Sequence, residues 1–235
     1  MTFTVIGRCP RSGRLGIGLA TYSLAVGGYC PAIHAGLGAV SSQAFVNPRL
    51  APLALSLLAL GHAAHRVMAT LMAEDPYIAY RQIGLVDAGG AVEAHTGERT
   101  RPWAGHLTGD GFLVMGNVLA GPPVLEAMAK AFAGNAGGEL DQRLLAALAA
   151  GRDAGGQQAA DGSHLPERSA SLHVHHGEPV AELDLRVDAH DAAVDELQRV
   201  HAVYRPYLPY YALRSKRPDQ TPPQDLWARQ NLAPR

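Results

Sequence analysis

A hydroxyl group and a terminal amine can come together at the start of this chain. Thr2 follows the initiator Met1 and opens a strand-like run over residues 2–6. A small second residue permits removal of the methionine, and the exposed threonine then carries both a nucleophile and a free α-amine as its base. The ordinary pKa of an α-amine is about 7.7–8.0, close to the value that suits a general base. The start of the chain therefore predicts a threonine nucleophile, although many proteins begin with Met-Thr for no catalytic reason.

Further polar side chains fall at strand ends or in tight loops, where they can meet a substrate. Asn117 ends an otherwise apolar strand, and its amide can donate a hydrogen bond to an oxyanion. His95 lies at the end of another predicted strand, and His106 lies in a compact loop. Asn and His at such places also commonly satisfy backbone groups, so each has a structural alternative.

A charged strand and a histidine-rich strand are the other patterned elements. Asp184, Arg186 and Asp188 alternate onto one face, usually a solvated or ion-paired ladder. If that face turns inward, Arg186 could hold a substrate carboxylate with two hydrogen bonds. His173 and His175 share a strand face, but a structural zinc site usually needs four ligands, and neither Cys-x-x-Cys nor His-Glu-x-x-His is present. We predict no metal and no cofactor.

Composition argues against several classes of partner. The 235 residues carry 20 basic and 21 acidic side chains, and this balance does not suggest nucleic acid or an anionic membrane. The start of the chain lacks the pattern of a signal peptide, and two cysteines give no disulfide framework. The longest apolar stretch, 50–60, is too short to span a bilayer. We predict a cytoplasmic protein that acts on a small molecule.

Blocks of strands alternate with blocks of helices along the chain. Strands are predicted over 2–6, 15–21, 36–40, 82–87, 91–95, 112–119, 169–174 and 180–187. Helices are predicted over 50–60, 62–73, 122–132, 139–150 and 192–204. Because helices do not alternate singly with strands, mainly antiparallel sheets with outer helices fit better than a Rossmann or TIM arrangement. Small residues on one face of the second strand suggest that two sheets pack together. The segment 151–167 lacks periodicity and reads as a surface loop, or a lid.

Seven short segments, in this order, resemble a bacterial and archaeal family of unknown function that is assigned to the N-terminal-nucleophile (Ntn) hydrolase-like class. The matching pieces are 1–6, 24–27, 42–48, 84–87 with 94–97, 103–106, 116–121 and 184–188. The resemblance implies an α+β fold, a four-layer αββα sandwich with two mainly antiparallel sheets between helical layers. It places Thr2 in the nucleophile position. The implied domain covers 1–204 and leaves a tail over 205–235 that is rich in proline and aromatic residues.

Together these features predict a hydrolase of a small amide, ureide or cyclic imide-type compound. Thr2 Oγ would attack the carbonyl group, the Thr2 amine would carry the proton to the leaving nitrogen, and Asn117 would stabilise the oxyanion before water hydrolyses the acyl-enzyme. Ser23, just after the second strand, is expected to hydrogen-bond the Thr2 amine. The residues expected to orient the substrate are Gln43, His95, His106 and Arg186.

Two other classes of function stay open. A non-catalytic protein could use the same fold to bind a small molecule or a cell-wall fragment, and retention of Met1 would favour it. An interaction protein could dock its tyrosine-rich tail on a partner. Base rates favour a homodimer. Residues 155–168 depart from the Gly-Gly-Asp and Arg-Gly pattern of many family members, so the substrate is left open.

Overall fold

The computed structural model describes residues 1–178 and 180–232 of the chain. It divides into two units, Met1–Leu197 and Gln198–Arg235. The division falls within the helix α5 (Ala193–Tyr204). Within the described residues, no helix is both long and apolar enough to cross a membrane.

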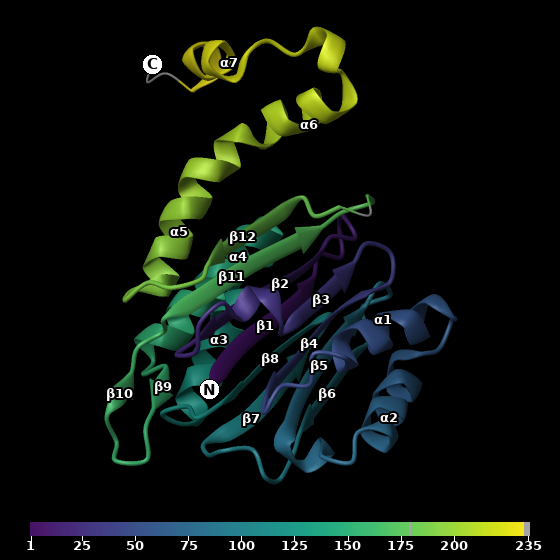
Figure 1. Cartoon of the computed structure of the whole chain (residues 1–235), viewed down its shortest axis with the longest axis vertical. Coiled ribbons are helices and arrows are strands. Elements are labelled where there is room, and N and C mark those ends of the chain that lie inside the picture. Colours follow the sequence, from purple (N-terminus) through teal and green to yellow (C-terminus); the bar gives the residue numbers. More distant parts are fainter. Residues whose placement is uncertain (179, 233–235) are drawn as a thin grey trace. The chain divides into compact units, whose positions relative to one another are not determined.

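A six-stranded antiparallel sheet forms one layer of the first unit. Its strand order is β12-β11-β2-β1-β8-β7, so the first strand of the chain lies in the interior of the sheet (Figure 1). The bounds of these strands are β1 (Thr2–Arg8), β2 (Leu15–Thr21), β7 (Ala104–Gly109), β8 (Phe112–Asn117), β11 (Ser169–His175) and β12 (Leu183–Val187).

A four-stranded antiparallel sheet with the order β3-β4-β5-β6 forms the next layer. Its strands are β3 (Pro31–His34), β4 (Gly38–Ala44), β5 (Arg81–Asp87) and β6 (Val92–Thr96). A small third sheet pairs β9 (Gln157–Gln158) with β10 (His164–Leu165), within the segment that was expected to be an irregular loop.

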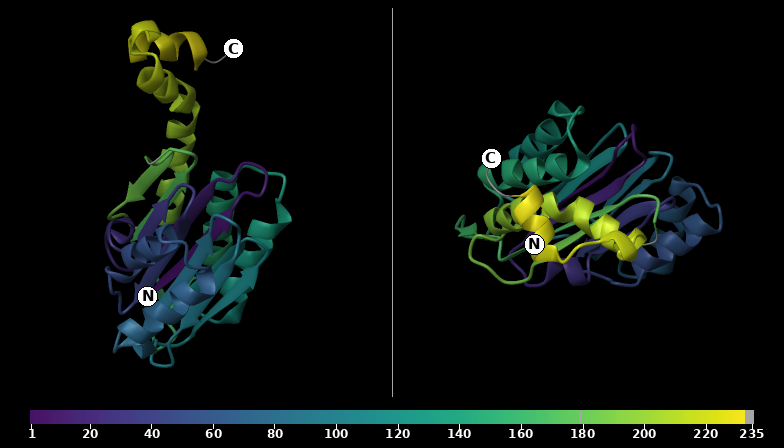
Figure 2. Two further views of the ribbon diagram at one scale, coloured as in Figure 1. Left: turned by 90° about the vertical axis from the view of Figure 1, so that its right-hand side faces the viewer. Right: turned by 90° about the horizontal axis from the view of Figure 1, so that it is seen from above.

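Two pairs of helices cover the outer faces of the large sheets. The helices α1 (Leu50–Ala59) and α2 (Ala64–Glu74) pack on the four-stranded sheet, and α3 (Pro122–Gly134) and α4 (Leu140–Asp153) pack on the six-stranded sheet. Figure 2 shows the strands between the blue helices on one side and the teal helices on the other. The predicted α+β class and the four-layer αββα sandwich are therefore confirmed.

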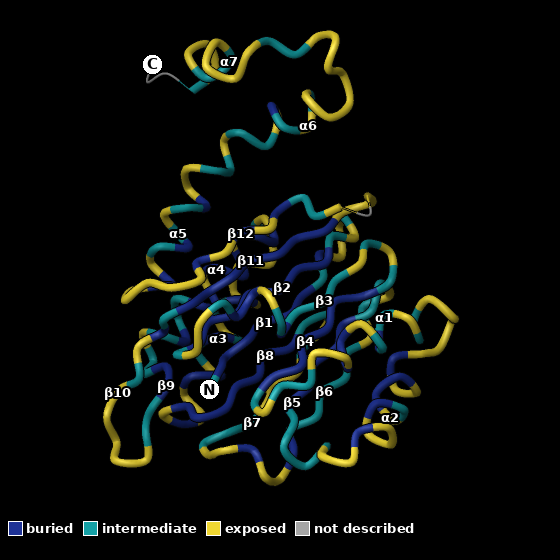
Figure 3. Tube along the Cα trace, viewed as in Figure 1, coloured by how far each residue is buried: buried dark blue, intermediate teal, exposed yellow. Residues whose placement is uncertain are grey.

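Large apolar and small residues alternate along β2, so one of its faces packs against the other sheet and the opposite face packs against a helix. Leu15, Ile17 and Leu19 are fully buried in the core between the two sheets. Gly16 faces α4 instead, where an added Cβ atom would lie 2.6 Å from Leu144 Cδ1. The face of β2 that carries its small residues therefore packs against α4. The expectation that this face packs against the second sheet was wrong. Figure 3 shows the buried strands at the centre of this unit.

Four strands were absent from the sequence-based prediction: β9 and β10 of the small third sheet, and β3 and β7 of the two large sheets. The compact loop expected around His106 is in fact part of β7, which pairs with β8 along its length. β12 begins at Leu183 and not at residue 180. β3 and β7 lie at sheet edges and bury little, so they lack the apolar alternation that reveals a half-buried strand.

The second unit contains α6 (Leu208–Lys216) and α7 (Gln224–Asn231), joined by a short turn. Tyr210 is buried in it and packs on Trp227 with 5.2 Å between ring centroids. The Tyr210 hydroxyl also donates a hydrogen bond to the Pro222 carbonyl oxygen at 3.2 Å. The tail thus has a small aromatic cluster of its own.

Candidate functional site at the start of the first strand

Thr2 lies at one end of β1, where three strands bring their polar side chains together. It is opposite Asn117 on β8, and its hydroxyl oxygen lies 3.3 Å from the hydroxyl oxygen of Thr21 on β2. Thr2 and Asn117 are buried, and Thr21 is fully so. Both threonine hydroxyls also lie within hydrogen-bond reach of the Met1 carbonyl oxygen. Removal of Met1 would release both hydroxyls beside the new amine, because that carbonyl is bonded to the Thr2 nitrogen.

The terminal amine lies in surroundings that favour its neutral form. Its pKa is lowered from 8.0 to about 6, first by burial and then by the positive charge of Arg101, while Cys30 opposes the shift. Burial in turn raises the pKa of the Cys30 thiol to about 12, so Cys30 is a neutral thiol at pH 7. The pKa of about 6 belongs to the amine of Met1. The amine of Thr2, which is exposed once Met1 is removed, would lie one residue further along the chain. An amine that is neutral at pH 7 is suited to act as a base.

Three buried amide side chains support Thr2 from the core between the sheets. Gln82 Oε1 accepts hydrogen bonds from Gln43 Nε2 at 2.7 Å and from Asn117 Nδ2 at 3.1 Å. Gln43 Nε2 also lies 3.5 Å from the Thr2 carbonyl oxygen, and the Thr4 hydroxyl donates to Gln43 Oε1. Connected networks of this kind hold buried polar groups in one arrangement. Gln43 and Asn117, both predicted as site residues, are thus placed beside Thr2.

Gln82 extends the network to His106. Gln82 Nε2 lies 2.9 Å from Thr96 Oγ1, and Thr96 Oγ1 lies 2.9 Å from His106 Nδ1. Burial, helped by the nearby His95, lowers the pKa of His106 below its usual value, so this imidazole is neutral at pH 7. His106 is therefore joined to Asn117 through two intervening side chains.

Three other predicted site residues lie apart from this arrangement. Ser23 is exposed, and only its backbone N–H reaches the site, donating to Thr21 Oγ1 at 3.2 Å. His95 shares a sheet face with residues that pack against α1 and α2, and its Nε2 lies 3.2 Å from a backbone carbonyl oxygen. Arg186 belongs to β12, three strands from β1, and its guanidinium pairs with both oxygens of Asp184.

Three residues that sequence reasoning did not select now stand at the site. Thr21 continues the inward-facing row of Leu15, Ile17 and Leu19, so its inward direction was available from the alternation alone. Gln82 was visible as a polar residue at the start of an apolar strand. Arg101 carried no local signal, because it lies in a loop whose position only the tertiary structure shows.

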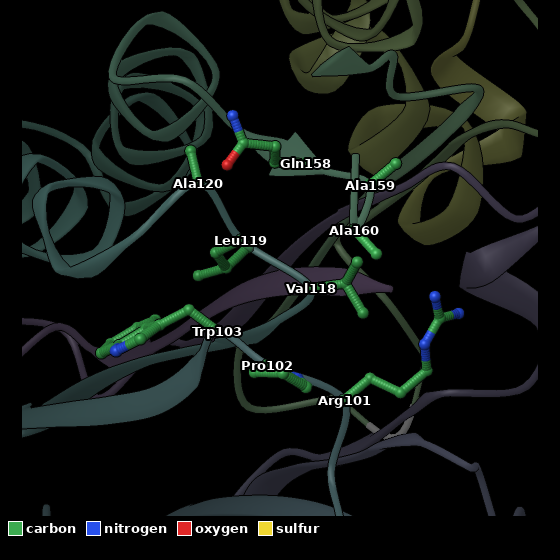
Figure 4. A pocket seen from close by; sticks show the side chains of 9 residues that line it. All are labelled: Arg101, Pro102, Trp103, Val118, Leu119, Ala120, Gln158, Ala159 and Ala160. Atoms are coloured by element: carbon green, nitrogen blue, oxygen red, sulfur yellow. The ribbon is translucent and has the colours of Figure 1, made fainter. Parts of the chain in front are cut away.

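A cavity of about 280 Å³ opens where the chain leaves β8 (Figure 4). Its wall includes Arg101, Trp103, Val118 and Leu119. Val118 directly follows Asn117 and has a φ of 58°, which is rare for a β-branched residue and turns the chain sharply away from the strand. A second cavity of about 510 Å³ shares Trp103 and reaches His106. The first cavity thus begins one residue from Asn117, and the second includes His106, which the hydrogen-bond network joins to Asn117.

The histidine-rich strand does not form a metal site. His173 Nδ1 lies 3.4 Å from Asp184 Oδ1, and the other ring nitrogen of His173 is buried without a hydrogen-bond partner. Among the residues that the structure describes, no three His, Cys, Asp or Glu side chains gather closely enough to hold a metal ion.

Comparison with known proteins gives a family and a close structural relative. A model described as a family of unknown function (DUF1028) matches residues 2–197. The crystal structure of a Silicibacter pomeroyi protein from the same family is similar to 86% of this chain and 88% of that chain, with 28% identity and a TM-score of 0.78.

More distant matches are two proteins described as Anbu, the first of them glossed as an ancestral beta-subunit. The Yersinia bercovieri protein has 12% identity over 94% of this chain and 98% of its own, with a TM-score of 0.42. The Hyphomicrobium protein has 13% identity over 86% and 94%, with a TM-score of 0.38. Neither likeness is strong enough to bear on activity. No protein with a curated function matches the chain.

Proposed function

The chain belongs to the family of unknown function DUF1028, so its activity has to be inferred from its site, and we propose that it is an N-terminal-threonine amidohydrolase. The observation that carries this proposal is the meeting of two buried hydroxyls, those of Thr2 and Thr21, 3.3 Å apart, at the Met1–Thr2 peptide group whose nitrogen becomes the Thr2 amine. The substrate is a small amide, ureide or cyclic imide-type compound, in keeping with cavities of a few hundred cubic ångströms.

Thr2 supplies both reacting groups once Met1 has been removed. The neutral amine takes the hydroxyl proton as Oγ adds to the substrate carbonyl carbon, which forms a tetrahedral oxyanion. The carbon–nitrogen bond then breaks, and the ammonium returns the proton to the leaving nitrogen. A water molecule, deprotonated by the same amine, attacks the resulting ester. This step releases the acid and restores the Thr2 hydroxyl.

Asn117 is the side chain best placed to stabilise the oxyanion. It is held directly opposite Thr2 in the sheet, and one hydrogen of its Nδ2 group is used by Gln82. The amide has two hydrogens, so the second can be donated to the developing charge. Because Gln82 and the surrounding amides are already fixed, little reorganisation is needed during the reaction.

Thr21 is a positioning residue in this mechanism. Its hydroxyl reaches the carbonyl oxygen of the Met1–Thr2 peptide group, so it is within reach of the nitrogen that becomes the Thr2 amine. A hydrogen bond from the amine to Thr21 Oγ1 would direct the nitrogen lone pair toward the Thr2 hydroxyl.

The test is the intact mass of the natively expressed protein, followed by a screen of small amides and ureides. We expect a mass that lacks one methionine, turnover by the wild-type protein and by Thr2→Ser, and none by Thr2→Ala. Active protein that retains Met1 would contradict the mechanism, because its threonine nitrogen is acylated and cannot act as a base. Undiminished turnover by Thr2→Ala would do the same.

A binding protein on the same fold is the second candidate, and one observation favours it. With Met1 present, the threonine hydroxyls are engaged with the Met1 carbonyl oxygen, while the cavity that begins at Val118, the residue after Asn117, is open. Retention of Met1 in the cell together with ligand binding would select this function.

A further inference from the structure

We infer that the substrate carries a carboxylate group and that Arg101 binds this group at the cavity beside Val118. The inference rests on the proposed function, because it concerns the substrate of the Thr2 site. It replaces Arg186, the arginine that the sequence suggested for this task, with one that the tertiary structure brings to the site.

Arg101 is tied by its backbone to the strand that carries Asn117. The Val118 N–H donates a hydrogen bond to the Arg101 carbonyl oxygen at 3.2 Å, and Val118 is the next residue after Asn117. Asn117 in turn lies opposite Thr2. The guanidinium is close enough for its charge to act on the terminal amine. A substrate group bound by Arg101 would therefore lie within a small molecule's length of the nucleophile.

Among the described residues, the lining of this cavity includes a positive charge and no negative charge. Arg101 is the one residue with a charged side chain among those that line it. Within the described residues, its guanidinium forms no ion pair and no side-chain hydrogen bond, whereas Arg81 pairs with Asp75 and Arg186 pairs with Asp184. A guanidinium offers a planar fork of N–H donors that matches the two oxygens of a carboxylate. An anionic ligand would supply the partner that the protein does not.

The remaining wall of the cavity indicates a compact substrate. Trp103, Leu119 and Ala159 contribute apolar surface, and the volume of about 280 Å³ lies near the lower end of the range for ligand sites. This combination suits a small amide that has a short apolar body and one carboxylate. An N-acylated amino acid is the simplest compound of that class.

Binding to the Thr2→Ala protein tests this inference without requiring turnover. Calorimetry would compare N-acetyl derivatives of glycine, alanine and leucine with their neutral carboxamides, which differ only in the charged group. We expect at least one carboxylate to bind about tenfold more tightly than its carboxamide. The preference should vanish in Thr2→Ala combined with Arg101→Gln and persist in part with Arg101→Lys.

Arg99 supplies the matched control, because its guanidinium stacks on Tyr80 and is not part of the cavity wall. Arg99→Gln in the same background should keep the preference for the carboxylate. Equal affinity for each charged and neutral pair, failure of all three carboxylates to bind, or a preference that survives Arg101→Gln would overturn the inference. Active protein that retains Met1, or turnover by Thr2→Ala, would contradict the proposed function. These outcomes are independent of the binding measurements, so failure of the inference can be told apart from failure of the proposed function.

Discussion

The hydroxyl oxygens of Thr2 and Thr21 lie 3.3 Å apart on neighbouring antiparallel strands, at the end of β1 where the chain begins. Thr21 is fully buried, so its hydroxyl is held in one place by the sheet and not by solvent. This pair is the structural basis for assigning Thr21, and not Ser23, as the partner of the terminal amine.

Replacement of Thr21 by valine should lower activity while the protein stays folded, because valine keeps the shape and removes the hydroxyl. A hydrogen bond to a charged group is worth about 1.5–3 kcal/mol, so we expect kcat/KM to fall roughly 10- to 100-fold. Steady-state kinetics over a range of pH would measure this loss. Thr21→Ser restores the hydroxyl and should recover most of the activity; equal impairment of both variants would point to packing instead.

The activity should depend on pH through the terminal amine. Burial and Arg101 lower the pKa of the Met1 amine, and the Thr2 amine would lie one residue further along the chain, so we expect its pKa also to be lowered and kcat/KM to fall on an acidic limb below the ordinary value of about 7.7–8.0 for an α-amine. Arg101→Gln removes a positive charge that disfavours the ammonium form, so the pKa should rise and the acidic limb should move to higher pH. A limb near pH 8 in the wild-type protein would show that the amine is not perturbed.

Gln82 should be important for stability as well as for the site. It is fully buried, and its Oε1 accepts hydrogen bonds from both Gln43 Nε2 and Asn117 Nδ2, so Gln82→Leu would remove the acceptor that these two buried amides share. We expect a loss of about 2–4 kcal/mol in the free energy of unfolding. Urea unfolding monitored by circular dichroism measures this change. Gln142→Ala, at an exposed position of α4, should change stability by less than about 0.5 kcal/mol.

Gly16 should not tolerate a larger residue. An added Cβ would lie 2.6 Å from Leu144 Cδ1 and 3.2 Å from the His173 carbonyl oxygen, so the Leu144 side chain would have to move and the β11 backbone would be crowded, and the two methyl groups of valine add to this. We expect Gly16→Val to cost about 1–3 kcal/mol of stability. Gly134→Ala, at the end of α3 with open space around it, should be neutral or mildly stabilising in the same thermal unfolding experiment. Equal stability of both variants would contradict the packing of β2 on α4.

Stability should fall in mild acid because of His173. Burial lowers the pKa of this imidazole from 6.5 to about 4, although Asp184 opposes the shift. Between these two values the unfolded chain binds more protons than the folded one, so stability decreases as the pH falls from 6.5 toward 4, by at most about 3 kcal/mol. Urea unfolding at several pH values would measure this slope. His173→Asn should flatten it, whereas the same change at the exposed His62 should not.

The order of strands and helices followed from the sequence because most buried strands alternate apolar and small or polar residues over five or more positions. β2 is the clearest instance, with Leu15, Ile17 and Leu19 on one face. β3 and β7 escaped detection because edge strands with little burial are under no such constraint. The sequence analysis also assigned the small residues of β2 to the wrong interface, because a glycine lets a helix approach as closely as a sheet.

The sequence by itself determined the fold class, the family and the prediction that Thr2 and Asn117 matter, because these depend on local pattern and on ordered short motifs. Only the tertiary structure decided which side chains surround Thr2. Thr21, Gln82 and Arg101 come from distant parts of the chain: strand pairing places Thr21, the packing of the two sheets places Gln82, and a loop bonded to Val118 places Arg101. Local periodicity carries no information about which strands become neighbours. For the same reason Arg186, plausible by pattern, lies three strands away, while Arg101 lies at the site.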